Sequence, residues 1–364
     1  MKTKKIALFL AGVIAGLLAV VLGYVLYMVI QFYRIEDNLS ISTENNQTEI
    51  ASASDEFSVL TFNIGFGAYT HDFSFFMDSG VMKTGEAVSG KNSTAASKEV
   101  VLKNTNGAIE LAKKQDADFY FFQEVDVKAT RSHKVNQLAA IQEAFGQHGS
   151  AFSYNFHSAF LAYPFHDPHG SVDAGIATLS RYAIASTTRH SFPVDLSFPT
   201  KFFDLDRCFQ VSRLALDNGK ELVLVNLHMS AYDEGGIVRQ QQLKLLNDVL
   251  AEEVKKGNYV VAGGDFNHDI AGSLNAFETA QEVPEWVFVL TDEDLAEGLR
   301  FAAAKNVPTC RSTDIPYEKG VNYTVVLDGF IVSDNVEVLS VTNVDADFEF
   351  SDHNPALLRF ALLP

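Results

Sequence analysis

The strongest constraint on this chain is a run of 28 residues near its start, residues 6–33, that contains no charged side chain. Roughly 20 consecutive apolar residues are enough to cross a bilayer, and they do so as a helix because no water is present to satisfy the backbone polar groups. We therefore predict a transmembrane helix over 6–33. A cleaved signal peptide is the alternative, but its apolar region is usually only about 7–15 residues long.

The charges on either side of this run predict its orientation. Three lysines lie within residues 1–5, whereas Arg34, Glu36 and Asp37 follow the run. Basic residues collect on the cytoplasmic side of membrane helices. We expect residues 1–5 to form a cytoplasmic tail. The expected localisation is the cell membrane, with a single span and the rest of the chain outside the cytoplasm.

The remaining chain is predicted to be one polar linker and one large domain. Residues 34–56 are rich in Ser, Asn and Glu, a composition typical of a flexible tether. No second segment of this kind interrupts residues 57–364, which we predict as a single domain. Its only cysteines are Cys208 and Cys310. This number excludes a disulfide-rich scaffold and a Cys-based zinc cluster, and leaves either one disulfide or two buried thiols.

Local patterns predict a mixed α/β domain. Short apolar runs are typical of buried strands; they cover residues 57–64, 118–125, 174–180, 221–228, 258–265 and 324–332. Helical periodicity covers 106–115 and 237–256. The Asp217-Asn218-Gly219 turn predicts a hairpin between antiparallel strands. Residues 67–100 show little periodicity and predict a long loop.

Several of the predicted strands end in polar residues. They are Asn63, Glu124, His228, and Asp265 with Asn267; Asp328 lies inside a strand, and Asp352 and His353 come just before the last one. Each alone has an ordinary structural explanation as a turn residue, a strand-end charge or a hydrogen-bonded histidine. The carboxyl ends of strands in α/β sheets converge on one crevice. The whole set in this order therefore predicts a shared site.

These residues carry a family resemblance. Asn63, "QE" at 123–124, "NLH" at 226–228, "GDFN" at 264–267, "LDGFIVS" at 327–333 and "SDHNP" at 351–355 resemble the motifs of the endonuclease/exonuclease/phosphatase superfamily. This superfamily comprises the deoxyribonuclease I-like enzymes and includes neutral sphingomyelinases. The resemblance covers about residues 57–364 and implies a four-layer sandwich of two mixed β-sheets flanked by helices. The separation of 61 positions from Asn63 to Glu124 exceeds what the family usually needs, because of the 67–100 segment.

The resemblance implies a metal site and a catalytic group. Glu124 is expected to bind Mg²⁺, with Asn63 beside it and Asp352 adding a carboxylate; Mn²⁺ is a possible substitute. His353 is expected to be the general base, oriented by Asp328.

Further roles are expected for other residues. Asp265 would orient the attacking water, Asn267 would bind a phosphate oxygen, and His228 would stabilise the reacting phosphorus centre or protonate the leaving group. Asp173 is a candidate partner for His228. Arg131, which follows Glu124 closely, is expected to contact the substrate.

These expectations describe a membrane-anchored, Mg²⁺-dependent phosphodiesterase, nuclease-like in the first place. The alternative is a sphingomyelinase or phospholipase C-type enzyme. The net charge of −18 disfavours tight passive binding of a polyanion, but a bound cation permits cleavage of one. A non-catalytic binding domain is disfavoured because no motif residue is missing. The expected partners are a phosphodiester substrate, either nucleic acid or a phospholipid headgroup, and the membrane; no protein partner is evident.

Overall fold

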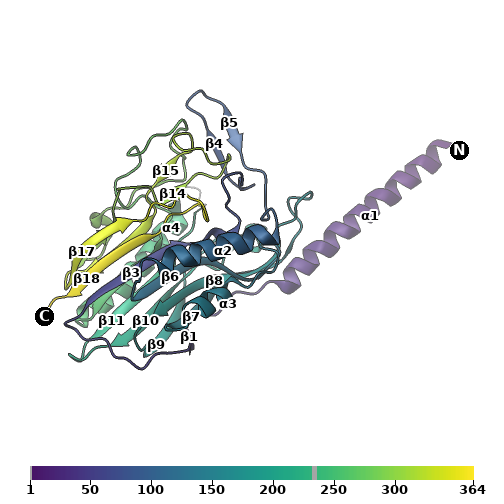
Figure 1. The fold of residues 1–364 in the computed structure, drawn as a ribbon. Coiled ribbons are helices and arrows are strands. Elements are labelled where there is room, and N and C mark those ends of the chain that lie inside the picture. The colour runs from purple at the N-terminus through teal and green to yellow at the C-terminus, as the bar shows by residue number, and fades with distance from the viewer. Residues whose placement is uncertain (1, 232–235) are drawn as a thin grey trace.

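The computed structural model describes residues 2–231 and 236–364, which form a layered body with one projecting helix (Figure 1). The helix is α1 (Lys2–Gln31). Within Thr3–Gln31, the most apolar window of 18 residues has a mean hydropathy of 2.7, and none of this window is buried within the protein. Helix α1 is thus long and apolar enough to cross a membrane.

The body is built on two seven-stranded mixed sheets. The first, called the β12 sheet, has the order β1 (Leu39–Ile41), β9 (Ser186–Ser191), β10 (Cys208–Ala215), β11 (Glu221–His228), β12 (Tyr259–Asp265), β16 (Asp328–Ser333), β13 (Leu299–Ala302). The second, called the β3 sheet, has the order β17 (Val336–Asn343), β18 (Ala356–Leu362), β3 (Glu56–Asn63), β6 (Phe119–Ala129), β8 (Gly170–Ser180), β7 (Gly149–Leu161), β2 (Thr43–Glu44).

Shorter elements complete the fold. They are the helices α2 (Lys98–Lys113), α3 (Gln137–Ala144) and α4 (Ile237–Lys255), the hairpins β4 (Ser79–Val81) with β5 (Ala87–Ser89) and β14 (Cys310–Arg311) with β15 (Thr324–Val325), and the 3₁₀ turns η1 (Gly65–Gly67), η2 (Thr200–Phe202) and η4 (Asp292–Asp294). Ser97 caps α2 by accepting a hydrogen bond from Val100.

Side-chain alternation along the strands produces the layers, because successive residues of a strand point to opposite faces. In β3, Phe57 and Val59 belong to the core between the two sheets, whereas Leu60 and Phe62 pack in the core beneath α2 and α3. Residues of β11 divide in the same way between the central core and a third core beneath α4. The result is the four-layer sandwich that the resemblance implied.

The central layer changes from apolar to polar toward one end of the sandwich. There Gln123 of β6 donates a hydrogen bond to Asn226 of β11 at 2.8 Å and another to Thr61 of β3 at 3.1 Å. All three side chains are fully buried. Because β6 and β11 belong to different sheets, the first of these bonds connects the two halves of the body directly.

The structure differs from the sequence expectations in three places. The polar segment 34–56 does not hang free: β1 pairs with β9 and β2 pairs with β7, so the segment adds an edge strand to each sheet. Edge strands face water on one side and therefore accept a polar sequence. The strand predicted over 324–332 is two strands, separated at Val326 and Leu327. The 67–100 segment contains the last residue of η1, the β4–β5 hairpin and the first residues of α2.

Candidate active site

Strand register brings the predicted site residues to one end of the sandwich. His228 of β11 lies beside Asp265 of β12, and Asp265 lies opposite Asp328 of β16. On the other sheet, Asn63 lies beside Gln123, the residue before Glu124. Asn63, His228 and Asp265 are the last residues of β3, β11 and β12, whereas Asp328 is the first residue of β16, which reaches the same end of the sandwich because it runs antiparallel to β12.

Unusual backbone conformations aim two of these side chains. Glu124 has a φ of 55° and sits where the register of β6 against β8 shifts. Asn267 has a φ of 51°. In "GGD", a Cβ on Gly263 would overlap the Phe330 ring, and a Cβ on Gly264 would overlap the carbonyl of Leu227. Both glycines are therefore required for the close packing that places Asp265.

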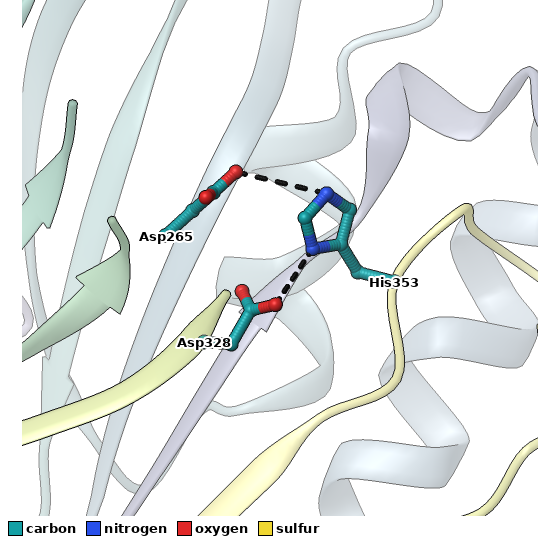
Figure 2. Close-up of side chains that lie close together, drawn as sticks. All are labelled: Asp265, Asp328 and His353. Atoms are coloured by element: carbon teal, nitrogen blue, oxygen red, sulfur yellow. Dashed lines mark hydrogen bonds and ion pairs between the residues drawn. The ribbon is translucent and has the colours of Figure 1, made fainter. Parts of the chain in front are cut away.

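His353 is held between two carboxylates (Figure 2). Its Nδ1 lies 2.7 Å from Asp328 Oδ2, and its Nε2 lies 3.6 Å from Asp265 Oδ2. Burial by itself lowers the pKa of His353, but the negative charges of Asp328 and Asp265 prevail and raise it well above its usual value. The histidine is 5% exposed, and its Nε2 faces the other catalytic candidates rather than bulk water.

Asp265 is the common acceptor of the cluster. Its Oδ2 accepts a hydrogen bond from Asn63 Nδ2 at 3.0 Å and lies 3.4 Å from His228 Nε2. Its Oδ1 accepts from the backbone N–H of Asn267 at 2.8 Å. Burial raises the pKa of Asp265 and lowers that of His228 well below its usual value. His228 is thus a neutral imidazole.

Glu124, Asn63 and Asp352 form a second group beside the first. Asn63 Nδ2 donates to Glu124 Oε1 at 3.2 Å, and Ser351 Oγ donates to the backbone carbonyl of Asn63 at 2.8 Å and lies 3.2 Å from Asp352 Oδ1. Desolvation raises the pKa of Asp352 to about 7 despite the opposing charge of His353, and the charge of Glu124 adds to the rise.

This donor set fits a hard divalent cation. Carboxylate and amide oxygens are the protein ligands that Mg²⁺ prefers. Within the described residues, Asp328 Oδ1 is also buried without a hydrogen-bond partner, which marks the region as short of positive charge. Among the described residues, potential ligand atoms of Asp265, Asp328 and His353 also lie within 4.8 Å of one another. In this cluster, His353 Nδ1 and Asp328 Oδ2 are already engaged in a hydrogen bond with each other.

The two groups open into one cavity of about 850 Å³. Glu124, Asp265, Asp352 and His353 line it. Asn267 and His228 do so as well, whereas Asn63 and Asp328 stand behind the lining residues that they contact.

Arg131 also lines this cavity, but an acidic neighbour engages its charge. Its guanidinium forms two hydrogen bonds with Asp126, at 2.8 and 3.2 Å, and lies 4.1 Å from the centre of the Phe66 ring.

Two findings were not foreseen. Asp173 does not pair with His228: its carboxylate lies 2.7 Å from His157 Nδ1, because the two residues face each other across β7 and β8. Arg311 lies in the cavity wall, is 2% exposed, and donates to the carbonyl of Thr70. The sequence signal for Arg311 was weak: a lone charge within the stretch from 306 to 313, "NVPTCRST".

The cysteine question is also resolved. Cys208 and Cys310 are both buried, unbonded thiols. Burial raises the pKa of Cys310, which lies beside His353, to about 12, and the thiol therefore stays neutral.

The fold and site define a class of protein, and comparison with known families names it. The model of the Endonuclease/Exonuclease/phosphatase family matches residues 60–353, so the chain belongs to this family. It is therefore a member of a group whose enzymes are typically metal-dependent hydrolases of phosphoester bonds.

Solved structures show the same fold at low sequence identity. D. rerio TDP2 in complex with a single-strand DNA product matches with a TM-score of 0.53 and 12% identity, covering 84% of this chain and 99% of that chain. A family protein from Leptotrichia buccalis gives 0.52 and 14%, covering 84% and 100%. One from Beutenbergia cavernae gives 0.51 and 15%, covering 85% and 72%. Comparison with curated proteins returns no match.

Proposed function

We propose that the chain is a membrane-anchored phosphodiesterase that uses Mg²⁺, with Mn²⁺ as a substitute. The observation that carries this proposal is the His353–Asp328 pair facing Asp265, with Glu124 and Asp352 lining the same cavity beside them. It puts a proton-transfer group and a cluster of cation-binding oxygens in the same cavity. Helix α1 supplies the anchor, with residues 1–5 in the cytoplasm and the body outside.

Glu124, Asn63 and Asp352 are the residues that would hold the cation. A bound divalent cation supplies positive charge that offsets both the carboxylates and the phosphate oxygens of a substrate. Without it, the carboxylates of Asp328 and Asp265 favour the imidazolium form of His353. Positive charge at the site is therefore expected to favour the neutral form that can accept a proton.

The protein's own groups divide the remaining tasks. Asp328 fixes His353 through Nδ1, so Nε2 is the atom that takes the proton of water. Asp265, next to Nε2, accepts the second hydrogen of that water and orients it. His228 is neutral and can donate to a non-bridging phosphate oxygen. Asn267, whose N–H is engaged by Asp265, is aimed by its positive φ toward the same cavity, where it would bind another oxygen.

Nucleic acid is one substrate class with support from the comparisons, because D. rerio TDP2 shares the fold and its structure contains a single-strand DNA product. A lipid phosphodiester is the second class, and the cavity wall favours it, as argued below. Both classes require the same bond to be cleaved.

The proposal is tested with the full chain in detergent and a soluble phosphodiester, bis(p-nitrophenyl) phosphate. We expect release of nitrophenol in Mg²⁺ and none in excess chelator. Glu124→Gln keeps the side-chain size but removes the ligand charge, so it should raise the Mg²⁺ concentration needed for half-maximal rate. A matched control is Glu349→Gln, an exposed glutamate that does not line the cavity. Full activity in chelator, or an unchanged Mg²⁺ requirement in Glu124→Gln, would refute the cation assignment.

A further inference from the structure

Helix α1 is fastened to the body at the same end as the site. The hydroxyl of Tyr24 donates to the carbonyl of Phe160 at 3.0 Å and accepts from the N–H of Ala162 at 3.0 Å. The hydroxyl of Tyr27 accepts from the N–H of Phe160 at 3.1 Å. Strand β7 ends at Leu161 and runs parallel to β6, since both are antiparallel to β8. The anchor therefore meets the sandwich at the carboxyl ends of β6 and β7.

The same contacts fix the depth of this junction. Tyr24 and Tyr27 belong to the apolar helix itself, and Met28 is 4% exposed because it packs against the body. If Thr3–Gln31 crosses a bilayer, the backbone of Phe160 and Ala162, which is hydrogen-bonded to Tyr24 and Tyr27, lies at the membrane–water interface. Tyrosine rings are enriched at that level of membrane proteins.

Two segments beside this junction expose a rim of large apolar side chains. Residues 160–165 read "FLAYPF" and residues 196–203 read "LSFPTKFF". Lys201 is the only charged residue within these two segments. Exposed fractions are 84% for Phe165, 64% for Phe198, 62% for Leu196, 59% for Tyr163, 44% for Phe203 and 42% for Phe160. We call these six residues the aromatic rim. Ring contacts join the rim to α1: Phe198 packs on Phe202, and Phe202 packs on Phe32.

The aromatic rim continues into the wall of the active-site cavity. Tyr163 and Phe203 line the cavity that also contains Glu124 and His353. Leu161, at the end of β7, lines it as well. Contiguous apolar surface of this kind on a soluble face marks an interaction site. Here the cavity opens next to the expected surface of the bilayer that α1 crosses.

Charge argues against a polyanion at this mouth. Strong binding of nucleic acid relies on lysine and arginine contacts to many phosphates. The cavity lining includes Asp195 and Asp204 as well as Arg207, and its two other arginines are engaged within the protein, Arg131 by Asp126 and Arg311 by the carbonyl of Thr70. A substrate with one phosphodiester and an apolar remainder therefore fits the cavity wall better than a polyanion with many phosphates.

We propose that the substrate is the headgroup phosphodiester of a lipid in the bilayer that holds α1, and that the aromatic rim sits in the interface of that bilayer. This inference rests on the proposed phosphodiesterase function. In the reaction, the oxygen of water bonds to phosphorus and one of the two ester P–O bonds breaks. The departing alcohol oxygen takes one proton, and the second proton of water leaves with the phosphomonoester or is released from it.

The test uses the full chain reconstituted in vesicles of phosphatidylcholine and sphingomyelin, with Mg²⁺. The rim variant is Phe165→Ser/Phe198→Ser, since neither residue lines the cavity. Its control is Ile50→Ser/Leu339→Ser, two exposed apolar residues outside the rim. We expect the rim variant to lose about tenfold or more of the lipid hydrolysis rate, because each phenylalanine leaves an apolar environment. The control variant and all rates on bis(p-nitrophenyl) phosphate should be unchanged.

The outcomes separate the two proposals. No hydrolysis of any phosphodiester in Mg²⁺ would refute the proposed function. Hydrolysis of the soluble ester and of a single-stranded DNA oligonucleotide, with both vesicle lipids untouched, would refute the lipid inference alone. An undiminished lipid rate in the rim variant would also refute it.

A second measurement is independent of activity. Both native cysteines are buried, so a cysteine introduced by Phe165→Cys can be labelled selectively with an environment-sensitive fluorophore. We expect lipids carrying a quencher near the headgroup to quench this label much more strongly than a label at Leu339→Cys. Equal quenching at the two positions would place the rim outside the interface and overturn the inference.

Discussion

The two ends of the sandwich both bury charge, but they do so in opposite ways. At the amino end of β11, Arg213 forms hydrogen bonds with Glu221 at 2.7 Å and with both oxygens of Glu253 at 2.7 and 2.8 Å. Lys256 and Asn258 complete the set around Glu253. At the other end, the three carboxylates of Asp328, Asp265 and Asp352 act together on the single imidazole of His353.

The pKa values follow this difference. Burial acts to raise the pKa of Glu253, but hydrogen bonds from Arg213, Lys256 and Asn258 prevail and lower it to about 2. Desolvation raises the pKa of Asp352 to about 7. A closed ion-pair network stabilises the fold as it stands, whereas an open acidic cluster is stabilised only by a ligand. The comparison therefore separates a charge cluster that is compensated within the fold from one that is not.

The largest effect is expected from substitutions that remove the proton-transfer group from the open cluster. His353→Ala and Asp328→Asn should each lower turnover of the soluble phosphodiester by about 10²–10⁴-fold, the usual contribution of a positioned general base. The double variant should lose scarcely more than either single one, because the two residues act as a unit. Steady-state kinetics in saturating Mg²⁺ measures this. Near wild-type turnover in His353→Ala would transfer the base role to another residue, with His228 next in line.

An intermediate effect is expected from opening the closed cluster. Glu253→Gln should lower the free energy of unfolding by about 2–3 kcal/mol, since it leaves Arg213 without its main partner. The folded-state pKa of Glu253 is depressed, so its stabilisation is full above about pH 4.5 and is lost as the pH falls toward 2. Denaturant unfolding of the wild type should show this loss, and the variant should not. Activity at neutral pH is expected to stay within about twofold, which keeps the two clusters distinct.

The smallest effect has the opposite sign. Asp352→Asn should raise the free energy of unfolding by about 1 kcal/mol in excess chelator, because it removes a desolvated charge that lacks compensation. The folded-state pKa of Asp352 is elevated, so the metal-free wild type should lose stability as the pH rises from about 4 through 7, and the variant should lose less. Urea titrations with chelator at three pH values measure the difference. A destabilised variant would mean that Asp352 is structurally compensated like Glu253.

Sequence patterns predicted the members of the open cluster because its geometry follows from local rules. Asn63, His228 and Asp265 end apolar strands, and strands of one sheet deliver their ends to the same edge. The "GGD" motif adds a steric reason, since both glycines meet neighbouring atoms. The mixed α/β class followed from the alternation of strand and helix patterns, and the four-layer sandwich followed from the family resemblance. The Asp217-Asn218-Gly219 turn predicted the hairpin, and β10 and β11 are antiparallel as predicted.

Other features depended on pairings that no local pattern encodes. Asp173 faces His157 because of the register between β7 and β8, which the sequence does not reveal. Arg311 reaches the cavity only through the contact between its strand and the segment containing Asp352. The segment 34–56 resembles a linker by composition, but two short pieces of it pair with sheet edges, where polar side chains are tolerated.

The hydrogen bond between Gln123 and Asn226 has a consequence for how the machinery stays aligned. Glu124 and Asn63 belong to one sheet, whereas Asp265, Asp328 and His228 belong to the other. Sliding one sheet past the other by a single residue would displace the two sets by about 3.3 Å, more than the length of a hydrogen bond. An amide pair that touches no substrate thus sets the relative translation of the two half-sites. The alignment of the two half-sites therefore depends on a contact in the interior of the protein.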